Sequence, residues 1–151
     1  MRTACSTFLA PLIASLWLMM MCFECTASAT DLADLSLALH APPNIEELSI
    51  NEARAIFSMR MRIWPDGSPI TVFVLPNNNP KHNLFVRSLL RLLPHQLKRN
   101  WDRLVYTGIG QAPIEVANEQ QMIQQLRSTP GSIGYINSGI QDETLHLIKL
   151  R

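Results

Sequence analysis

The segment Ile70–Leu75, which reads Ile-Thr-Val-Phe-Val-Leu, constrains the fold more than any other part of the chain. Its residues are β-branched or apolar at positions on both faces of an extended strand. A strand of this kind is buried on both sides, as in sheets that helices cover on both faces. We therefore predict a small single α/β domain with a mixed β-sheet flanked by helices.

The remaining strands of this sheet are expected towards the two ends of the domain. In residues 34–40, Leu35, Leu37 and Leu39 alternate with small or polar residues, which is the period of a strand. Residues 132–136 and 144–150 form two short apolar runs separated by a turn at residues 137–139. We expect these two runs to pair directly as a hairpin.

Capping residues mark the starts of the first helices. Ser49 or Asn51 can cap a helix over residues 50–57. Asn79 followed by Pro80 opens another helix, because proline is tolerated in a first turn where its missing N–H is not needed.

The polar and apolar pattern indicates how the helical region continues. The run from residue 81 is expected to break at Pro94, and a second helix then extends to about residue 104. A third helix follows a cap at Asn118. In the first of these runs, the residues expected to face inward are Leu84, Phe85, Leu89 and Leu92.

Residues 1–29 have the pattern of a secretory signal peptide. A positive start at Arg2 is followed by an apolar core and by Ala27-Ser28-Ala29, a small-x-small cleavage site. We expect cleavage after Ala29, secretion to the periplasm and one domain over residues 30–151. The alternative is an uncleaved N-terminus that remains as an anchor.

The residue types that remain in the exported domain limit its chemistry. All three cysteines lie inside the leader, which excludes disulfides, a thiol nucleophile and a thiolate metal site. No serine sits in a nucleophile elbow, and no glycine-rich phosphate loop follows a strand. The histidines have no metal-ligand spacing; they are His40, His82, His95 and His146. We expect no enzyme activity, no metal and no organic cofactor.

Three motifs occur in order along the chain. Leu48–Phe57 reads Leu-Ser-Ile-Asn-Glu-Ala-Arg-Ala-Ile-Phe, Trp64–Gly67 reads Trp-Pro-Asp-Gly, and Thr129–Tyr135 reads Thr-Pro-Gly-Ser-Ile-Gly-Tyr. In that order they resemble the phosphate-type periplasmic solute-binding proteins of ABC transporters. Residues 85–90 and 101–108 extend the likeness. The resemblance implies one lobe of a type 2 periplasmic binding protein and a role in solute binding for transport.

The chain departs from this family at the binding loop. The family loop reads Arg-x-x-x-Gly-Ser-Gly-Thr and holds phosphate at a helix N-terminus, whereas Leu75–His82 has none of those residues in place. Family members also close two lobes around the ligand, and this chain offers one. Phosphate capture is therefore not carried over by the resemblance. A single lobe either captures no solute or borrows a second wall from a partner or from another copy of itself.

Asn77, Asn78, Asn79, Lys81 and His82 are the candidate ligand-binding residues. They cluster at a predicted helix start, where free N–H groups and the helix dipole favour an anion such as phosphate. The alternative interpretation is a solvated turn with an asparagine cap.

Arg87, Arg91, Arg99 and Arg103 form the candidate partner surface. Arg87 and Arg91 are four residues apart, and so are Arg99 and Arg103, which places each pair on one helical stripe. Such stripes could dock on acidic lipid headgroups or on an acidic protein, and the alternative is a solvated helix face. We expect no nucleic-acid binding and no membrane-surface contact, which leaves a protein of the cell envelope.

The sequence thus predicts an exported, non-catalytic binding or accessory protein related to the substrate-binding proteins of phosphate ABC transporters. In one version it binds phosphate or another small oxyanion through residues 77–82, with self-association or a partner completing the cleft. In the other version it is an adaptor of the cell envelope that has lost small-ligand binding. The lost loop residues favour the adaptor, and the resemblance favours the solute binder.

Overall fold

The computed structural model describes residues 35–40, 45, 47–140, 142–148 and 150–151. The expected signal peptide, its cleavage site and the alternative anchor lie outside these residues. In chain order the described elements are β1 (Leu35–His40), α2 (Ile50–Phe57), β2 (Thr71–Val74), α3 (Pro80–Leu84), the π-helix η1 (Phe85–Leu89), α4 (Pro94–Tyr106), β3 (Ile114–Glu115), α5 (Glu119–Ser128), β4 (Ser132–Asn137) and β5 (His146–Ile148).

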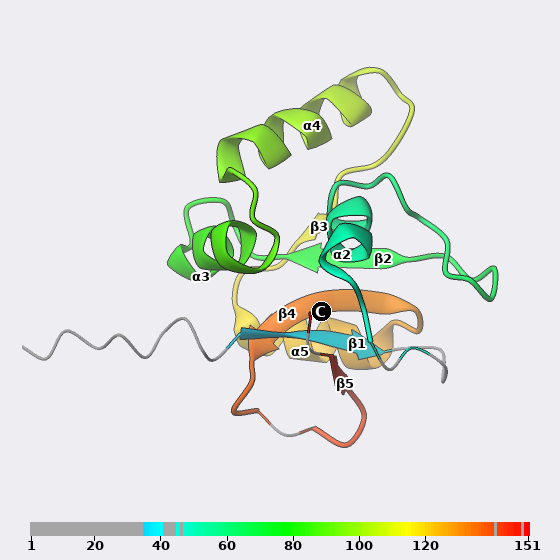
Figure 1. The fold of residues 1–151 in the computed structure, drawn as a ribbon, viewed down its shortest axis with the longest axis vertical. Coiled ribbons are helices and arrows are strands. Elements are labelled where there is room, and N and C mark those ends of the chain that lie inside the picture. Colours follow the sequence, from blue (N-terminus) through cyan, green and yellow to red (C-terminus); the bar gives the residue numbers. More distant parts are fainter. Residues whose placement is uncertain (1–34, 41–44, 46, 141, 149) are drawn as a thin grey trace, which may run out of the picture.

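The described strands form one mixed sheet in the order β3-β2-β4-β1-β5 (Figure 1). β2 runs parallel to β3 and β4, whereas β1 is antiparallel to β4 and β5. Val72, Phe73 and Val74 of β2 are all buried. The predicted fold class is confirmed, and so is the doubly covered strand at residues 70–75.

The expected hairpin between the last two strands is wrong. β1 lies between β4 and β5, so that Leu37 pairs with Tyr135 on one side and with Ile148 on the other. β1 can occupy this internal position because Leu37, Ala38 and Leu39 are all apolar and fully buried. Closeness in sequence favoured the hairpin, but burial of β1 determined the pairing.

Helices cover both faces of the sheet. Gly134 of β4 faces α5, because a Cβ added there would lie 2.6 Å from Met122 Sδ. Tyr135 points to the opposite face, where it packs on Phe57 of α2 and Phe85 of η1. The layers are thus α5, the sheet, and α2 with η1, and α4 lies outside them (Figure 1). α4 is attached to α2 through the Trp101 indole N–H, which donates to the carbonyl of Phe57 at 2.8 Å.

Local signals in the sequence placed the helix starts correctly. The Ser49 hydroxyl accepts the N–H of Glu52 at 3.2 Å, and the Glu52 carboxylate accepts the N–H of Ser49 at 2.8 Å. These reciprocal bonds form a capping box at the start of α2. Asn79 and Asn118 cap α3 and α5 with their side-chain oxygens.

The helix after Asn79 differs from the expectation. Only its first turn is α-helical, and η1 continues it with the wider spacing of a π-helix. The wider turn moves the inward face, so that Phe85, Val86 and Leu90 are buried. Of the four residues expected to face inward, Phe85 is therefore the buried one. The other three are only partly buried, namely Leu84, Leu89 and Leu92.

The turn before β4 requires glycine at position 131. Gly131 has a φ of 75°, and an added Cβ would lie 2.7 Å from the backbone oxygen of Pro69. The Gly131 carbonyl also accepts the indole N–H of Trp64 at 2.9 Å, which holds the turn in place. We predict that Gly131→Ala lowers the free energy of unfolding by about 2–4 kcal/mol, because positive φ costs about 1–2 kcal/mol and overpacking about 1–3 kcal/mol.

Gly67→Ala is the matched control for that substitution. Gly67 also has a positive φ, 89°, but nothing lies within 4 Å of an added Cβ. We expect a loss of about 1–2 kcal/mol from the backbone conformation alone, measured by urea unfolding. Equal losses from the two substitutions would contradict the predicted clash at Gly131.

Candidate functional site

The five candidate ligand residues begin just beyond the C-terminal end of β2, in the loop that opens α3. The Asn79 side-chain oxygen accepts the backbone N–H of Lys81 at 2.9 Å. Pro80, in the first turn, has no N–H to donate, and Asn78 is exposed. The start of α3 is therefore a capped turn whose first donors are absent or already bonded.

Lys81 is paired with α5. Its Nζ lies 2.5 Å from Glu119 Oε2, and Glu119 Oε1 accepts the backbone N–H of Asn137 at 2.6 Å. Hydrogen bonds to an ionised group are stronger than those between neutral groups. Glu119 thus joins the start of α3 to the end of β4, and the lysine of the loop already has an acidic partner.

His82 is fully buried. Its Nδ1 lies 2.7 Å from the Tyr135 hydroxyl oxygen, which also accepts the N–H of Leu75 at 2.8 Å. Trp101 of α4 packs beside the imidazole with ring centroids 6.1 Å apart. The Tyr135 hydroxyl group still has its own O–H to donate, and we assign this bond to His82 Nδ1 as the acceptor. The proton of the neutral imidazole is then on Nε2.

The surroundings keep this pair of side chains uncharged. Burial lowers the pKa of His82 from 6.5 to about 4, because the imidazolium form would lose its hydration. Burial also raises the pKa of Tyr135 well above its ordinary value. Both groups are neutral at pH 7, so His82 offers no positive charge to an anion.

Two buried polar side-chain atoms of this loop have no hydrogen-bond partner among the described residues. They are His82 Nε2 and Asn77 Oδ1, and both are buried. Most buried polar atoms in proteins are bonded. These two atoms are the feature of the loop that favours a polar ligand.

The structure separates the four candidate arginines. Arg87 is exposed on η1, whereas Arg91 follows the end of that helix with a φ of 51°. The prediction that these two share a helical stripe is wrong, because η1 ends at Leu89. Arg99 and Arg103 are both exposed on α4, as the spacing predicted.

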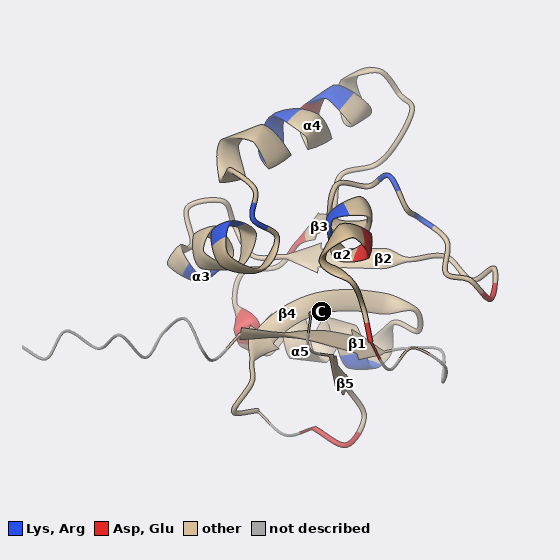
Figure 2. Cartoon of the chain, in the orientation of Figure 1, with Lys and Arg blue, Asp and Glu red and all other residues tan. Residues whose placement is uncertain are grey.

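Basic residues gather on one half of the described structure. Figure 2 shows Lys and Arg on α4, α3–η1, α2 and the segment after α2, whereas several of the Asp and Glu residues lie around the opposite half. The sequence analysis did not single out Arg54, Arg60 and Arg62, which add to this basic half. Their spacing matches no single helical stripe, and a change of chain direction after α2 brings Arg60 back beside α2.

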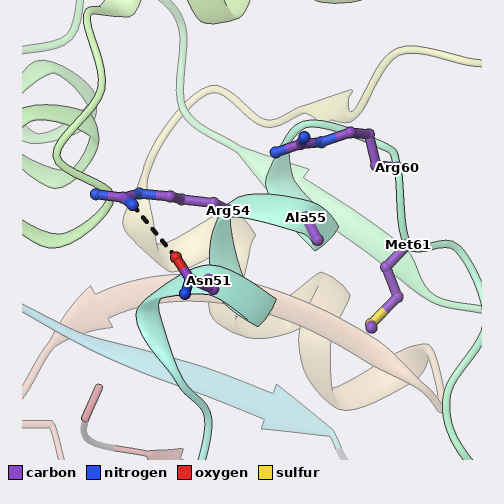
Figure 3. Close-up of a pocket in the computed structure, with 5 residues that line it drawn as sticks. All are labelled: Asn51, Arg54, Ala55, Arg60 and Met61. Carbon is purple, nitrogen blue, oxygen red and sulfur yellow. Dashed lines mark hydrogen bonds between the residues drawn. The ribbon is translucent and has the colours of Figure 1, made fainter.

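A cavity of about 530 Å³ lies beside α2, and Figure 3 shows the side chains that line it. Arg54 Nε donates to the Leu90 carbonyl at 2.6 Å, and Arg60 Nε donates to the Ser58 hydroxyl at 3.0 Å. Neither arginine forms an ion pair within the described residues. Each guanidinium is thus oriented by a neutral oxygen. The lining residues are Asn51, Arg54, Ala55, Arg60 and Met61.

The described residues include neither a metal-binding cluster nor a membrane-spanning helix. No group of three or more His, Cys, Asp or Glu side chains in that part of the chain could hold a metal ion. Among the same residues, none of the helices combines the length and the apolar character that crossing a bilayer requires.

The fold is similar to that of solved phosphate-binding proteins. A Clostridium perfringens protein with bound phosphate has a TM-score of 0.61 and 15% sequence identity to this chain. An ABC-type phosphate transport receptor from Vibrio cholerae has a TM-score of 0.58 and 14% identity. PstS from Borrelia burgdorferi has a TM-score of 0.59 and 17% identity. No family model and no curated protein matches the chain.

These matches cover most of this chain but only part of each solved protein. Each match covers 78% of this chain but only 45%, 46% and 47% of the respective protein. The chain therefore spans less than half the length of the proteins it resembles, consistent with a single-lobe form. The predicted resemblance to phosphate ABC transporter substrate-binding proteins is confirmed at the level of the fold.

The buried His82 makes a pH-dependent contribution to stability. Its pKa is lower in the folded state, so the unfolded chain binds more protons between pH 6.5 and about 4. This contribution is present above pH 6.5 and is lost as the pH falls towards 4. We predict a loss of about 3 kcal/mol from this group alone, at 1.36 kcal/mol per pKa unit.

Urea unfolding of the wild type and of His82→Asn at pH 7 and pH 4.5 measures this contribution. The variant should be less stable at pH 7, because its shorter side chain fits the buried site less well. Its stability should fall less than that of the wild type between the two pH values. Parallel decreases for the two proteins would show that His82 does not titrate in this range.

Proposed function

We propose that this chain is an exported, non-catalytic binding or accessory protein of the periplasm, and that it acts as an adaptor for a protein partner. The observation that carries this proposal is that the Lys81 N–H and the Lys81 ammonium of the loop at residues 77–82 bond within the chain, while basic side chains of α4 and η1 remain exposed. The fold of the phosphate-binding proteins supports a binding role. Secretion through a cleaved signal peptide at residues 1–29 is part of the proposal.

The contacts of the loop weigh against phosphate capture there. An anion at a helix start needs free N–H groups and a cation. Here the Lys81 N–H is bonded to Asn79, Pro80 has none, and the Lys81 ammonium pairs with Glu119. His82 is neutral and buried.

The basic side chains favour a partner with an acidic surface. Arg87, Arg91 and Arg99 are exposed and form no ion pair within the described residues. Opposite charges across an interface speed association and select the partner. Arg103 is also exposed and donates only to Asn100, at 3.2 Å, among the described residues.

Oxyanion binding at residues 77–82 is the second candidate function. It is favoured by two unpartnered atoms: His82 Nε2, whose N–H could donate to an oxyanion, and Asn77 Oδ1, which could accept from a protonated oxygen of the same ligand. It would also require a partner or a second copy to complete the cleft.

Thermal unfolding in phosphate, sulfate and chloride at matched ionic strength separates the two candidates. The adaptor proposal predicts the same midpoint in all three salts. A phosphate site in the loop would instead stabilise the folded state by about 2.7 kcal/mol at 100 times the dissociation constant, a shift of several degrees. Lys81→Ala should remove such a shift, whereas Lys98→Ala, which breaks the exposed pair with Asp102, should not.

Photo-crosslinking in intact cells tests the adaptor directly. A photoreactive residue at Gln96, exposed on α4, is expected to capture one envelope protein. The double substitution Arg99→Gln with Arg103→Gln should reduce that adduct several-fold, since it removes two charges from the same helix. The same photoreactive residue at exposed Gln124 of α5 is the control. Equal adducts from the two positions would refute the proposed surface.

A further inference from the structure

A cavity of about 600 Å³ lies where the N-terminal end of β1 and the end of β4 meet η1. Leu35 pairs with Asn137, the last residue of β4, so Ser138 is at the carboxyl end of a strand that runs parallel to β2. Ligands of α/β proteins bind at this end of the sheet. The volume falls in the range of small-molecule sites, about 300–1,000 Å³.

The lining combines one cation, hydroxyl groups and an apolar part. Four of the lining residues are polar, namely Ser36, Ser88, Arg91 and Ser138, and five are aliphatic, Leu35 and Leu89 among them. Arg91 is in no ion pair of the described residues. The serine hydroxyls that bond within that part of the chain belong to other positions, Ser49, Ser58, Ser68, Ser128 and Ser132.

The backbone at Arg91 is held in a strained conformation. Its φ of 51° lies in the left-handed region, which residues with a side chain rarely adopt. The Leu90 N–H is bonded to Phe85 O at 3.2 Å and the Leu92 N–H to Val86 O at 2.9 Å. Strained residues of this kind cluster at functional sites, and the adjoining π-helix is a second feature that is frequent there.

Arg54 fixes this segment from the other side. Its Nε donates to the Leu90 carbonyl, directly before Arg91, at 2.6 Å, and Figure 3 shows the Arg54 side chain extending from α2. Arg54 lines the cavity of Figure 3 and not the one lined by Arg91. Arg54 is therefore a positioning residue, which helps to set where Arg91 enters its cavity.

We propose that the cavity lined by Arg91 binds an aliphatic carboxylate. The carboxylate bonds to the Arg91 guanidinium and the serine hydroxyls, and the hydrocarbon part packs against Leu35 and Leu89. A single guanidinium balances a monoanion and forms paired hydrogen bonds with a planar carboxylate. A phosphate dianion would keep unbalanced charge beside an apolar lining, which is unfavourable. This site rests on the proposed binding role and gives it a location away from residues 77–82.

Two sources can supply the same chemistry. One is a free carboxylic acid with a short hydrocarbon chain, and the other is the C-terminal carboxylate of a partner protein that ends in an aliphatic residue. Both place one negative charge next to an apolar group. The probes below distinguish them.

Isothermal titration calorimetry of the whole protein tests the site. The probes are hexanoate, inorganic phosphate, and an acetylated tripeptide ending in leucine as the free acid or as the amide. Hexanoate or the free-acid peptide should bind, and the amide and phosphate should not. Arg91→Gln should weaken binding about 10- to 100-fold, the usual range for losing a hydrogen bond to a charged group. Arg60→Gln removes the same charge from the neighbouring cavity and should leave the affinity unchanged.

Arg91→Gly separates loss of the ligand group from loss of the fold. Glycine adopts positive φ without strain, so the unfolding midpoint should stay the same or rise while carboxylate binding disappears. Tighter binding of hexanoate would identify the free acid as the ligand, and tighter binding of the free-acid peptide would identify a partner C-terminus; either result supports the site.

Several results would overturn the carboxylate site. These are no binding by either carboxylate probe, tighter binding of phosphate, affinity unaffected by Arg91→Gln, or affinity lost in Arg60→Gln. Crosslinking from Gln96 without carboxylate binding would overturn this site and leave the adaptor proposal standing. Carboxylate binding without a crosslinked partner would support this site and overturn the adaptor proposal.

Discussion

The side chain of Tyr135 joins four elements of this domain, through stacking of its ring and through two hydrogen bonds of its hydroxyl group. Its ring stacks on Phe85 of η1 with centroids 3.9 Å apart and an angle of 11° between the planes. Its hydroxyl accepts the N–H of Leu75, just beyond β2, and bonds to His82 of α3. Leu75 is buried, and an unbonded N–H there would destabilise the fold. One side chain thus connects β4, β2, α3 and η1.

This arrangement explains why the loop after β2 differs from an anion site. Anion sites at helix starts keep donors unbonded until the ligand arrives. In this chain the Lys81 N–H bonds to Asn79 and the Lys81 ammonium to Glu119, and the His82 ring accepts from Tyr135. The polar groups therefore stabilise the lobe itself, which supports the proposal that binding has moved elsewhere on the molecule.

The sequence predicted those features that depend on a few neighbouring residues. The caps at Ser49, Asn79 and Asn118, the doubly covered β2 and the mixed sheet follow from local spacing and composition. The features that depend on distant residues were missed: the placement of β1 between β4 and β5, the two-residue strand β3 and the π-helix. The resemblance to phosphate-binding proteins predicted the fold because its motifs lie in these structural segments and not in the binding loop.

The same difference between local and distant effects applies to the candidate site. A helical wheel places Arg91 beside Arg87, but the π-helix ends at Leu89 and Arg91 adopts positive φ beyond it. That conformation costs about 1–2 kcal/mol for a residue with a Cβ, and glycine would adopt it without that cost. Within the described residues no ion pair of Arg91 offsets this cost. The hydrogen bonds of the Leu90 and Leu92 N–H groups and the Arg54 bond to the Leu90 carbonyl maintain this conformation, so Arg91 lines its cavity before a ligand binds. This preorganisation favours the cavity lined by Arg91 over the loop that the sequence suggested.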